Sequence, residues 1–246
     1  MLAQLPNDFN ALVAGASGGI GSALVDALLA TPRLGRLYAV SRNEVRRDDP
    51  RLSALPLDLT EPEGLEALSN ALPDRPLHLV INTLGLLHDE ASGIFPEKKL
   101  GELDGDALAR LFHVNATTPA LLLQTLEPAL KGHHPVLIGS LSARVGSIGD
   151  NRLGGWYAYR ASKAAHNMLM KTAAVELRRL NPNAVVICLH PGTTDTALSA
   201  PFQARVPEGK LFSPTFVAER LLIVLGERRP ADSGGFLDWN DVPIPW

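Results

Sequence analysis

Short apolar runs alternate along the chain with longer segments whose apolar residues recur at helical spacing. Each run has the length of a strand and is apolar at successive positions, which is typical of parallel strands buried in a sheet. The runs that predict strands are Ala11–Ala14, Arg36–Val40, Leu55–Leu57, Leu77–Ile81, Val136–Ile138 and Ala184–Leu189.

The intervening segments predict amphipathic helices over Ile20–Leu29, Pro62–Leu72, Asp104–Leu130 and Trp156–Leu180, then a last helix over Pro214–Leu225 and a last strand over Gly235–Asp238. This alternation predicts an α/β protein with a single-domain Rossmann fold over residues 1–246. Its doubly wound parallel sheet would have about seven strands, with helices on both faces. Residues 197–213 have no regular period and are interpreted as a substrate lid, with a passive surface loop as the alternative.

Composition and charge narrow the class of partner. The 246 residues are 46% hydrophobic and 20% charged, with a net charge of −3. We therefore expect a globular protein that binds a small molecule and neither nucleic acid nor a membrane. No apolar run reaches the roughly 18 residues of a membrane span, and no secretory signal is evident, which favours the cytoplasm. The histidines and the single cysteine form no metal-binding motif, so no metal site is expected.

A glycine-rich turn joins the first predicted strand to the first predicted helix. Glycines allow the backbone to turn sharply and to approach a pyrophosphate, while the helix N-terminus presents free N–H groups to its negative charge. The position of this turn at the first strand–helix junction predicts a dinucleotide site. Its candidate cofactor-binding residues are Gly15, Ser17, Gly18, Gly19, Ile20 and Gly21.

The end of the second predicted strand indicates which dinucleotide is bound. An acidic residue there would bind the ribose 2′-hydroxyl of NAD, but the strand ends in Ser41 and Arg42. An arginine can instead bind the 2′-phosphate of NADP through two charge-assisted hydrogen bonds. We therefore expect NADP(H), with NAD(H) as the alternative if Arg42 is only a solvated surface residue.

Further candidates follow the third and fourth strands, at the carboxyl ends where ligands collect in such sheets. After the third strand, Asp58 and Leu59 are cofactor candidates, although Asp58 could equally cap the helix that begins near Pro62. After the fourth strand the candidates are Asn82, Thr83, Leu84 and Gly85.

Tyr159 and Lys163 lie four residues apart in a predicted helix and therefore on the same face. The ordinary pKa of tyrosine, about 10, makes it a poor base at neutral pH. A neighbouring ammonium stabilises the phenolate and is expected to lower this pKa. The pair predicts an acid/base group. Tyr157 is a second phenol nearby, but no lysine follows it four residues later.

The chain resembles the short-chain dehydrogenases/reductases in a combination of five features. These are the glycine turn, the segment Asn82–Gly85, Asn115, a serine after the fifth strand and the Tyr159/Lys163 pair. The resemblance extends along nearly the whole chain. It implies that Tyr159 is the general acid/base, that Lys163 binds the nicotinamide ribose and that Asn115 supports a proton relay. Pro191, Gly192, Thr193 and Thr196 would contact the cofactor's nicotinamide part or its phosphate. His190, just before them, is interpreted as a hydrogen-bonded residue at a strand end.

The serine that orients the substrate carbonyl has two candidates. The segment Gly146–Ile148 favours Ser142, whereas the strand Val136–Ile138 favours Ser140 with an insertion after it. Ser142 is the preferred assignment.

A second expectation for Asn115 concerns its main-chain carbonyl and does not depend on the resemblance. Pro119 has no N–H, so in a continuous helix the carbonyl of Asn115 loses its partner. We hypothesise that this carbonyl binds a water that links Lys163 to solvent; in the alternative, Pro119 only kinks the helix.

Four stretches narrow the resemblance to one branch of the family, the C-factor and sniffer-like carbonyl reductases. They are Leu87–Asp89 and residues 142–151, 154–157 and 234–246. This branch implies reduction of a carbonyl substrate by NADPH, or an NADP-binding sensor or signalling protein with little turnover. A pocket formed by Leu86, Leu87, Ser142, Trp156 and Leu198 would be mainly apolar and would suit a hydrophobic aldehyde, ketone or quinone. By resemblance, the two longest helices would pair to form a homodimer or homotetramer.

Overall fold

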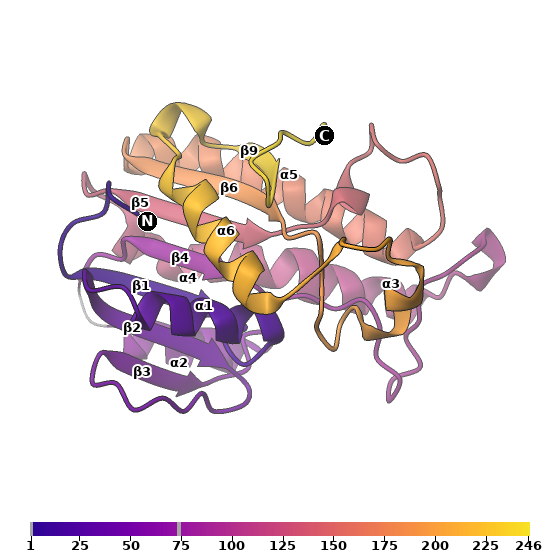
Figure 1. Cartoon of the computed structure of the whole chain (residues 1–246), viewed down its shortest axis with the longest axis horizontal. Coiled ribbons are helices and arrows are strands. Elements are labelled where there is room, and N and C mark those ends of the chain that lie inside the picture. Colours follow the sequence, from indigo (N-terminus) through magenta and orange to yellow (C-terminus); the bar gives the residue numbers. More distant parts are fainter. Residues whose placement is uncertain (1, 73–74) are drawn as a thin grey trace.

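The computed structural model describes residues 2–72 and 75–246. Seven parallel strands form one twisted sheet in the order β3-β2-β1-β4-β5-β6-β9 (Figure 1). The strands are β1 (Phe9–Ala14), β2 (Leu34–Ser41), β3 (Leu52–Pro56), β4 (Leu79–Asn82), β5 (Val136–Leu141), β6 (Ala184–His190) and β9 (Gly235–Asp238). The predicted Rossmann fold is thus confirmed.

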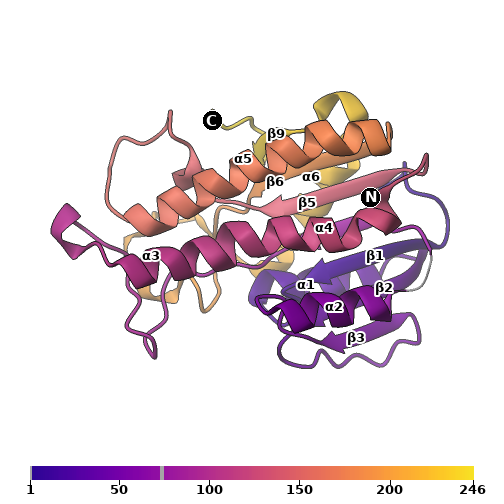
Figure 2. The same ribbon diagram turned by 180° about the vertical axis from the view of Figure 1, so that it is seen from behind.

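Helices cover both faces of the sheet. On one face lie α1 (Gly19–Leu29) and α6 (Pro214–Gly226), which pack on each other and on the sheet (Figure 1). On the other lie α2 (Pro62–Ala71), α4 (Thr118–Leu130) and α5 (Tyr157–Leu180) (Figure 2). Each face has its own apolar core because the strands are buried on both sides.

Most elements begin or end one to three residues from the expected positions, and three of the differences lie beside the site. The third strand, β3, begins at Leu52 and ends at Pro56, so Leu57 lies beyond it. Trp156 precedes α5 rather than beginning it. The helix predicted over Asp104–Leu130 consists of α3 (Gly105–Phe112), a π-helical turn (His113–Thr117) and α4. The π turn lies just before Pro119, whose missing N–H disturbs the regular hydrogen-bond ladder.

The shorter elements lie in the connections. Strands β7 (Thr193–Thr194) and β8 (Leu211–Phe212) pair at the two ends of the segment interpreted as a lid. Turns of 3₁₀ helix cover Leu100–Glu102, Arg144–Gly146, Ala200–Arg205 and Pro230–Asp232. Within the described residues, no helix is long and apolar enough to cross a membrane.

The direction of chain progression reverses at β1. From β1 the chain proceeds to β2 and β3 on one side, then returns to β4 on the other side of β1. The connections after β1 and β4 therefore diverge at the carboxyl edge of the sheet, which leaves a crevice there. This edge carries the candidate site.

Candidate active site

The glycine turn is built for close backbone approach. Gly15 has a φ of +80°, a conformation that L side chains rarely adopt. A Cβ on Gly21 would lie 2.1 Å from the carbonyl oxygen of Gly15, so α1 can pack against the turn only with glycine at this position. The Thr83 hydroxyl from the end of β4 donates hydrogen bonds to the carbonyls of Ala14 (2.8 Å) and Gly15 (3.1 Å) and ties β4 to the turn.

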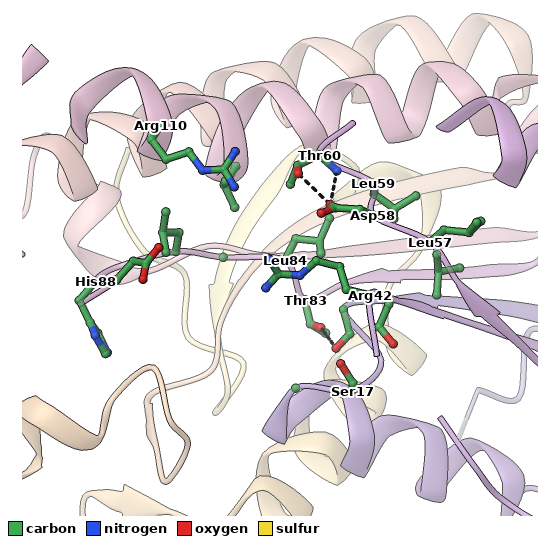
Figure 3. A pocket seen from close by; sticks show the side chains of 18 residues that line it. Ser17, Arg42, Leu57, Asp58, Leu59, Thr60, Thr83, Leu84, His88 and Arg110 are labelled. Carbon is green, nitrogen blue, oxygen red and sulfur yellow. Dashed lines mark hydrogen bonds between the residues drawn. The ribbon is translucent and has the colours of Figure 1, made fainter. Parts of the chain in front are cut away.

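A cleft of about 500 Å³ opens beside this turn (Figure 3). It brings together ten of the predicted cofactor residues: Gly15, Ser17, Gly18, Ser41, Arg42, Asp58, Leu59, Thr83, Leu84 and Gly85. Gly21 and Asn82 do not line it. The buried Asn82 amide instead donates to Ser140 Oγ (2.8 Å) and accepts from the N–H of Leu84 (3.1 Å), so Asn82 shapes the loop behind the cleft.

Two arginines approach the cleft from different elements. Arg42 follows β2 and Arg110 lies on α3, and Figure 3 shows both guanidinium groups on the cleft side. Arg110 was not predicted, because no sequence signal shows which face of α3 turns to the cleft. Although burial opposes the shift, hydrogen bonds from Thr60, together with both arginines, lower the pKa of Asp58. The positive charges give this end of the cleft the character of an anion site.

Asp58 does not cap a helix. Its carboxylate accepts hydrogen bonds from the N–H (2.9 Å) and the hydroxyl (2.7 Å) of Thr60, whereas the N-cap of α2 is Glu61. The capping alternative is thus wrong, and Asp58 belongs to the wall of the cleft.

A second cavity, of about 270 Å³, lies beyond the glycine turn. Its apolar lining includes Leu87, Trp156 and Leu198 as expected, together with Phe202 and Val206 from the lid segment. Leu86 was also expected here but lines the first cleft. Four predicted residues from the segment after β6 and one from α1 also line the second cavity: Pro191, Gly192, Thr193, Thr196 and Ile20. Gly19 lies behind Thr196, since a Cβ on Gly19 would lie 2.6 Å from Thr196 Cγ2.

Tyr159 lines this second cavity, and Lys163 lies one turn later on the buried side of α5. Lys163 Nζ donates to the carbonyl of Leu141 (2.9 Å) and lies 5.9 Å from the centre of the Tyr159 ring. Burial lowers the pKa of Lys163 to about 8. Burial raises the pKa of the Tyr159 phenol, whereas the sequence analysis expected it to be lowered. The expected direction is wrong for this structure because desolvation outweighs the attraction to the ammonium.

The two candidate serines have different surroundings. Ser142 lines the second cavity with Tyr159, and its hydroxyl donates to Asn167 Oδ1 on α5 (2.6 Å). Ser140 does not line it and is bonded to Asn82. The geometry therefore favours Ser142, with Asn167 fixing its rotamer.

Asn115 connects several parts of the site. Its side-chain amide accepts from the N–H of Leu86 (2.7 Å) and donates to the carbonyl of Leu86 (2.8 Å) and to Ser162 Oγ (3.0 Å). Its main-chain carbonyl accepts from Nδ1 of the fully buried His166 (3.0 Å). One of the two lone pairs of the carbonyl that was expected to bind a relay water is thus used by an imidazole.

Helix α5 receives its N-terminal cap from a distant loop. The backbone at Gly154, Gly155 and Trp156 is left-handed, and the Trp156 side chain supplies no cap. Glu97, which is 5% exposed, instead accepts from the N–H of Ala158 with both carboxylate oxygens (3.3 Å each), while its carbonyl accepts from the N–H of Trp156. This arrangement places the Trp156 indole against Tyr159, with ring centres 6.2 Å apart.

His190 differs from its expected role. It lies at the end of β6 and lines the second cavity, but its side chain makes no hydrogen bond to any described residue. Nδ1 is buried and unpaired. Burial, followed by the charge of Arg144, lowers the pKa of His190 to about 4. The ring is therefore neutral at physiological pH.

Comparison with known proteins matches residues 10–206 to the family model described as short chain dehydrogenase. The chain belongs to the short-chain dehydrogenase family. It is therefore an oxidoreductase that acts on CH–OH or C=O groups, as the resemblance implied.

Among the family's members, C-signal from Myxococcus xanthus is 32% identical over 70% of this chain and 93% of its own length. The NADPH-bound carbonyl reductase from chicken fatty liver superposes with a TM-score of 0.85 at 25% identity, covering 98% of this chain and 100% of that one. A Burkholderia multivorans family member with bound NADP gives a TM-score of 0.75 at 26% identity, over 97% of this chain and 100% of that one. These similarities confirm the expected branch.

Proposed function

We propose that the protein reduces an apolar aldehyde, ketone or quinone with NADPH, and that Tyr159 supplies the proton. The observation that carries this proposal is the position of the Tyr159 phenol in an apolar cavity, one helical turn from Lys163 and beside the cleft of the glycine turn. The two cavities provide separate places for a small substrate and for a dinucleotide.

The first cleft fits NADP(H). The glycine turn would leave space for the pyrophosphate, and α1, which begins at Gly19, would present its N-terminal N–H groups to this charge. Arg42 and Arg110 would supply cations for a 2′-phosphate, and Asp58 and Leu59, which also line this cleft, would hold the adenosine half. The segment from Pro191 to Thr196 lines the second cavity and would hold the nicotinamide half. Bound there, the nicotinamide supplies the hydride.

The protonation state of Tyr159 favours reduction. Because burial raises the pKa of its phenol, Tyr159 carries its proton at neutral pH and can donate it to the carbonyl oxygen as the carbon is reduced. Lys163 places a positive charge beside the phenolate that remains. To orient the carbonyl oxygen toward Tyr159, the Ser142 hydroxyl turns its single proton from Asn167 Oδ1 to the substrate. Oxidation of an alcohol would need the phenolate first and would be favoured only at high pH.

Two further parts belong to the proposal. Residues 197–213 form a lid, because Phe202 packs on Trp156 (ring centres 5.1 Å apart) and closes one side of the substrate cavity.

Two copies of the chain associate through α4 and α5, which lie side by side on the outside of the sheet (Figure 2). Their exposed surface includes the apolar side chains Leu121, Met168, Leu169 and Val175.

The test is turnover of a panel of apolar aldehydes, ketones and quinones with NADPH. The rate is measured as the loss of absorbance at the nicotinamide band of NADPH. Tyr159→Phe removes only the ionisable hydroxyl and is expected to lower kcat by about 10²–10⁴-fold. Tyr157→Phe is the matched control and should retain activity. Binding of NADPH without turnover of any carbonyl would instead favour the nucleotide-binding sensor.

A further inference from the structure

Arg160 joins the two ends of a surface loop formed by residues 145–155. Its guanidinium donates hydrogen bonds to the main-chain carbonyls of Gly155 (2.9 Å), Gly154 (3.1 Å) and Val145 (3.4 Å). A guanidinium offers five N–H donors in a fixed plane, so one arginine can bind carbonyls from two chain segments at once. This side chain therefore holds the start and the end of the loop together.

The end of the loop has a backbone that needs such support. Gly154, Gly155 and Trp156 have positive φ values of 64°, 66° and 52°. Glycine adopts this left-handed conformation readily, whereas tryptophan, which carries a Cβ, rarely does. Hydrogen bonds from outside hold the turn in place: Arg160 donates to the carbonyls of both glycines, and the carbonyl of Glu97 accepts from the N–H of Trp156.

Both segments that Arg160 joins form walls of the substrate cavity. Val145 and Trp156 line this cavity, whereas Arg160 itself does not. The Trp156 indole packs on the ring of Tyr159 (centres 6.2 Å apart) and on that of Phe202 (5.1 Å). The position of the indole therefore decides how much room remains beside the phenol for the group attached to the substrate carbonyl.

We propose that Arg160 is a positioning residue that sets the size of the substituent that the substrate cavity accepts. It does not touch the substrate and acts through the backbone that carries Trp156 and Val145. This inference rests on the proposed function, because the cavity beside Tyr159 must be the substrate site. Without the guanidinium the left-handed turn relaxes, the indole moves away from the phenol and the cavity widens. A small substrate is then held less well, and a bulky one fits better.

The first experiment follows the indole without any turnover. Trp239→Phe and Trp246→Phe leave Trp156 as the only tryptophan, so acrylamide quenching of its fluorescence reports its accessibility. In this background Arg160→Met should raise the quenching constant about twofold, because three charge-assisted hydrogen bonds are lost. Arg160→Lys keeps the charge but has one ammonium for three carbonyls, so its rise should be smaller. Arg178→Met removes an exposed arginine from the far end of α5 and is the matched control, which should change nothing.

The second experiment compares benzaldehyde with 4-tert-butylbenzaldehyde, which differ only in an apolar substituent. The quantity measured is kcat/KM for the bulky aldehyde divided by kcat/KM for the small one. Arg160→Met should raise this ratio about tenfold, which corresponds to about 1.4 kcal/mol. In Trp156→Ala the wall that Arg160 positions is already absent, so adding Arg160→Met should change the ratio by less than about twofold. A role in stability alone would leave the ratio unchanged in both backgrounds.

An unchanged quenching constant in Arg160→Met would overturn the inference, as would an unchanged ratio or a ratio that changes equally in the Trp156→Ala background. If Arg160→Met does not fold, Arg160→Lys decides by the same measurements. If the unmodified protein reduces neither aldehyde, the quenching constant decides alone. Failure of the proposed function is recognised separately, by Tyr159→Phe retaining turnover.

Discussion

The cap that Glu97 places on α5 is expected to control both stability and catalysis. In Glu97→Ala the N–H of Ala158 loses its acceptor at a site where Glu97 itself is only 5% exposed. Loss of a helix cap costs about 1 kcal/mol, and an unsatisfied buried N–H about 1–3 kcal/mol. We therefore expect a loss of about 2 kcal/mol, which for a chain of this size lowers Tm by about 4–8 °C.

Glu97→Gln separates the hydrogen bond from the charge. The amide oxygen can still accept from Ala158, and only the attraction between the carboxylate and the helix N-terminus is lost, worth about 0.3–1 kcal/mol. The Tm of Glu97→Gln should therefore lie between those of Glu97→Ala and the unmodified protein, measured by calorimetry in one buffer.

The kinetic consequence follows from the place of Tyr159 in the first turn of α5. Loosening this turn displaces the phenol and the Trp156 indole packed on it, so kcat should fall in Glu97→Ala. NADPH affinity should not change, since Glu97 does not line the cofactor cleft. An unaltered Tm would refute the capping argument. A lowered Tm with unaltered kcat and KM would show that the cap is structural only.

Three further predictions follow from other parts of the molecule. Arg42→Ala should weaken NADPH binding at least tenfold while leaving NADH binding nearly unchanged, as measured by fluorescence titration, because it removes a cation beside the proposed 2′-phosphate site. Lys163 has a folded-state pKa of about 8, below its ordinary 10.5, so the unfolded chain binds more protons than the folded one between these pH values. The free energy of unfolding should therefore rise with pH in this range, and urea titrations of Lys163→Met should show a smaller rise. Met168→Glu places a charge on the exposed apolar surface of α5 and should convert a dimer to a monomer in sedimentation experiments.

The fold could be predicted because its signals are local and repeated. Buried parallel strands require apolar residues at successive positions, and six such runs with helices between them leave few alternatives to a doubly wound sheet. Boundaries were less accurate. Leu52 begins β3 although the residues around it are not uniformly apolar, because pairing with β2 through Leu37 and Leu52 decides where the strand starts. The π turn before Pro119 also depends on tertiary contacts.

Those site residues could be predicted that lie close to one another in the sequence. Tyr159 and Lys163 lie on one helix, and the glycine turn is a continuous segment. Arg110 and Glu97 gave no signal, since each acts on an element distant in sequence. The direction of the Tyr159 pKa shift could not be obtained from the spacing to Lys163 either, because it depends on how completely both groups are buried.

Asn115 shows how one residue can serve the site in two independent ways. Its side chain holds the backbone of Leu86 beside the cofactor cleft, a task that needs an amide with both a donor and an acceptor. Its main-chain carbonyl, which cannot accept from the residue four positions later because Pro119 has no N–H, accepts from the imidazole of His166. That bond supplies a hydrogen-bond partner that Pro119 cannot provide. It also leaves one lone pair on the carbonyl oxygen, so the proposed relay water would bind to a carbonyl already fixed in position by His166.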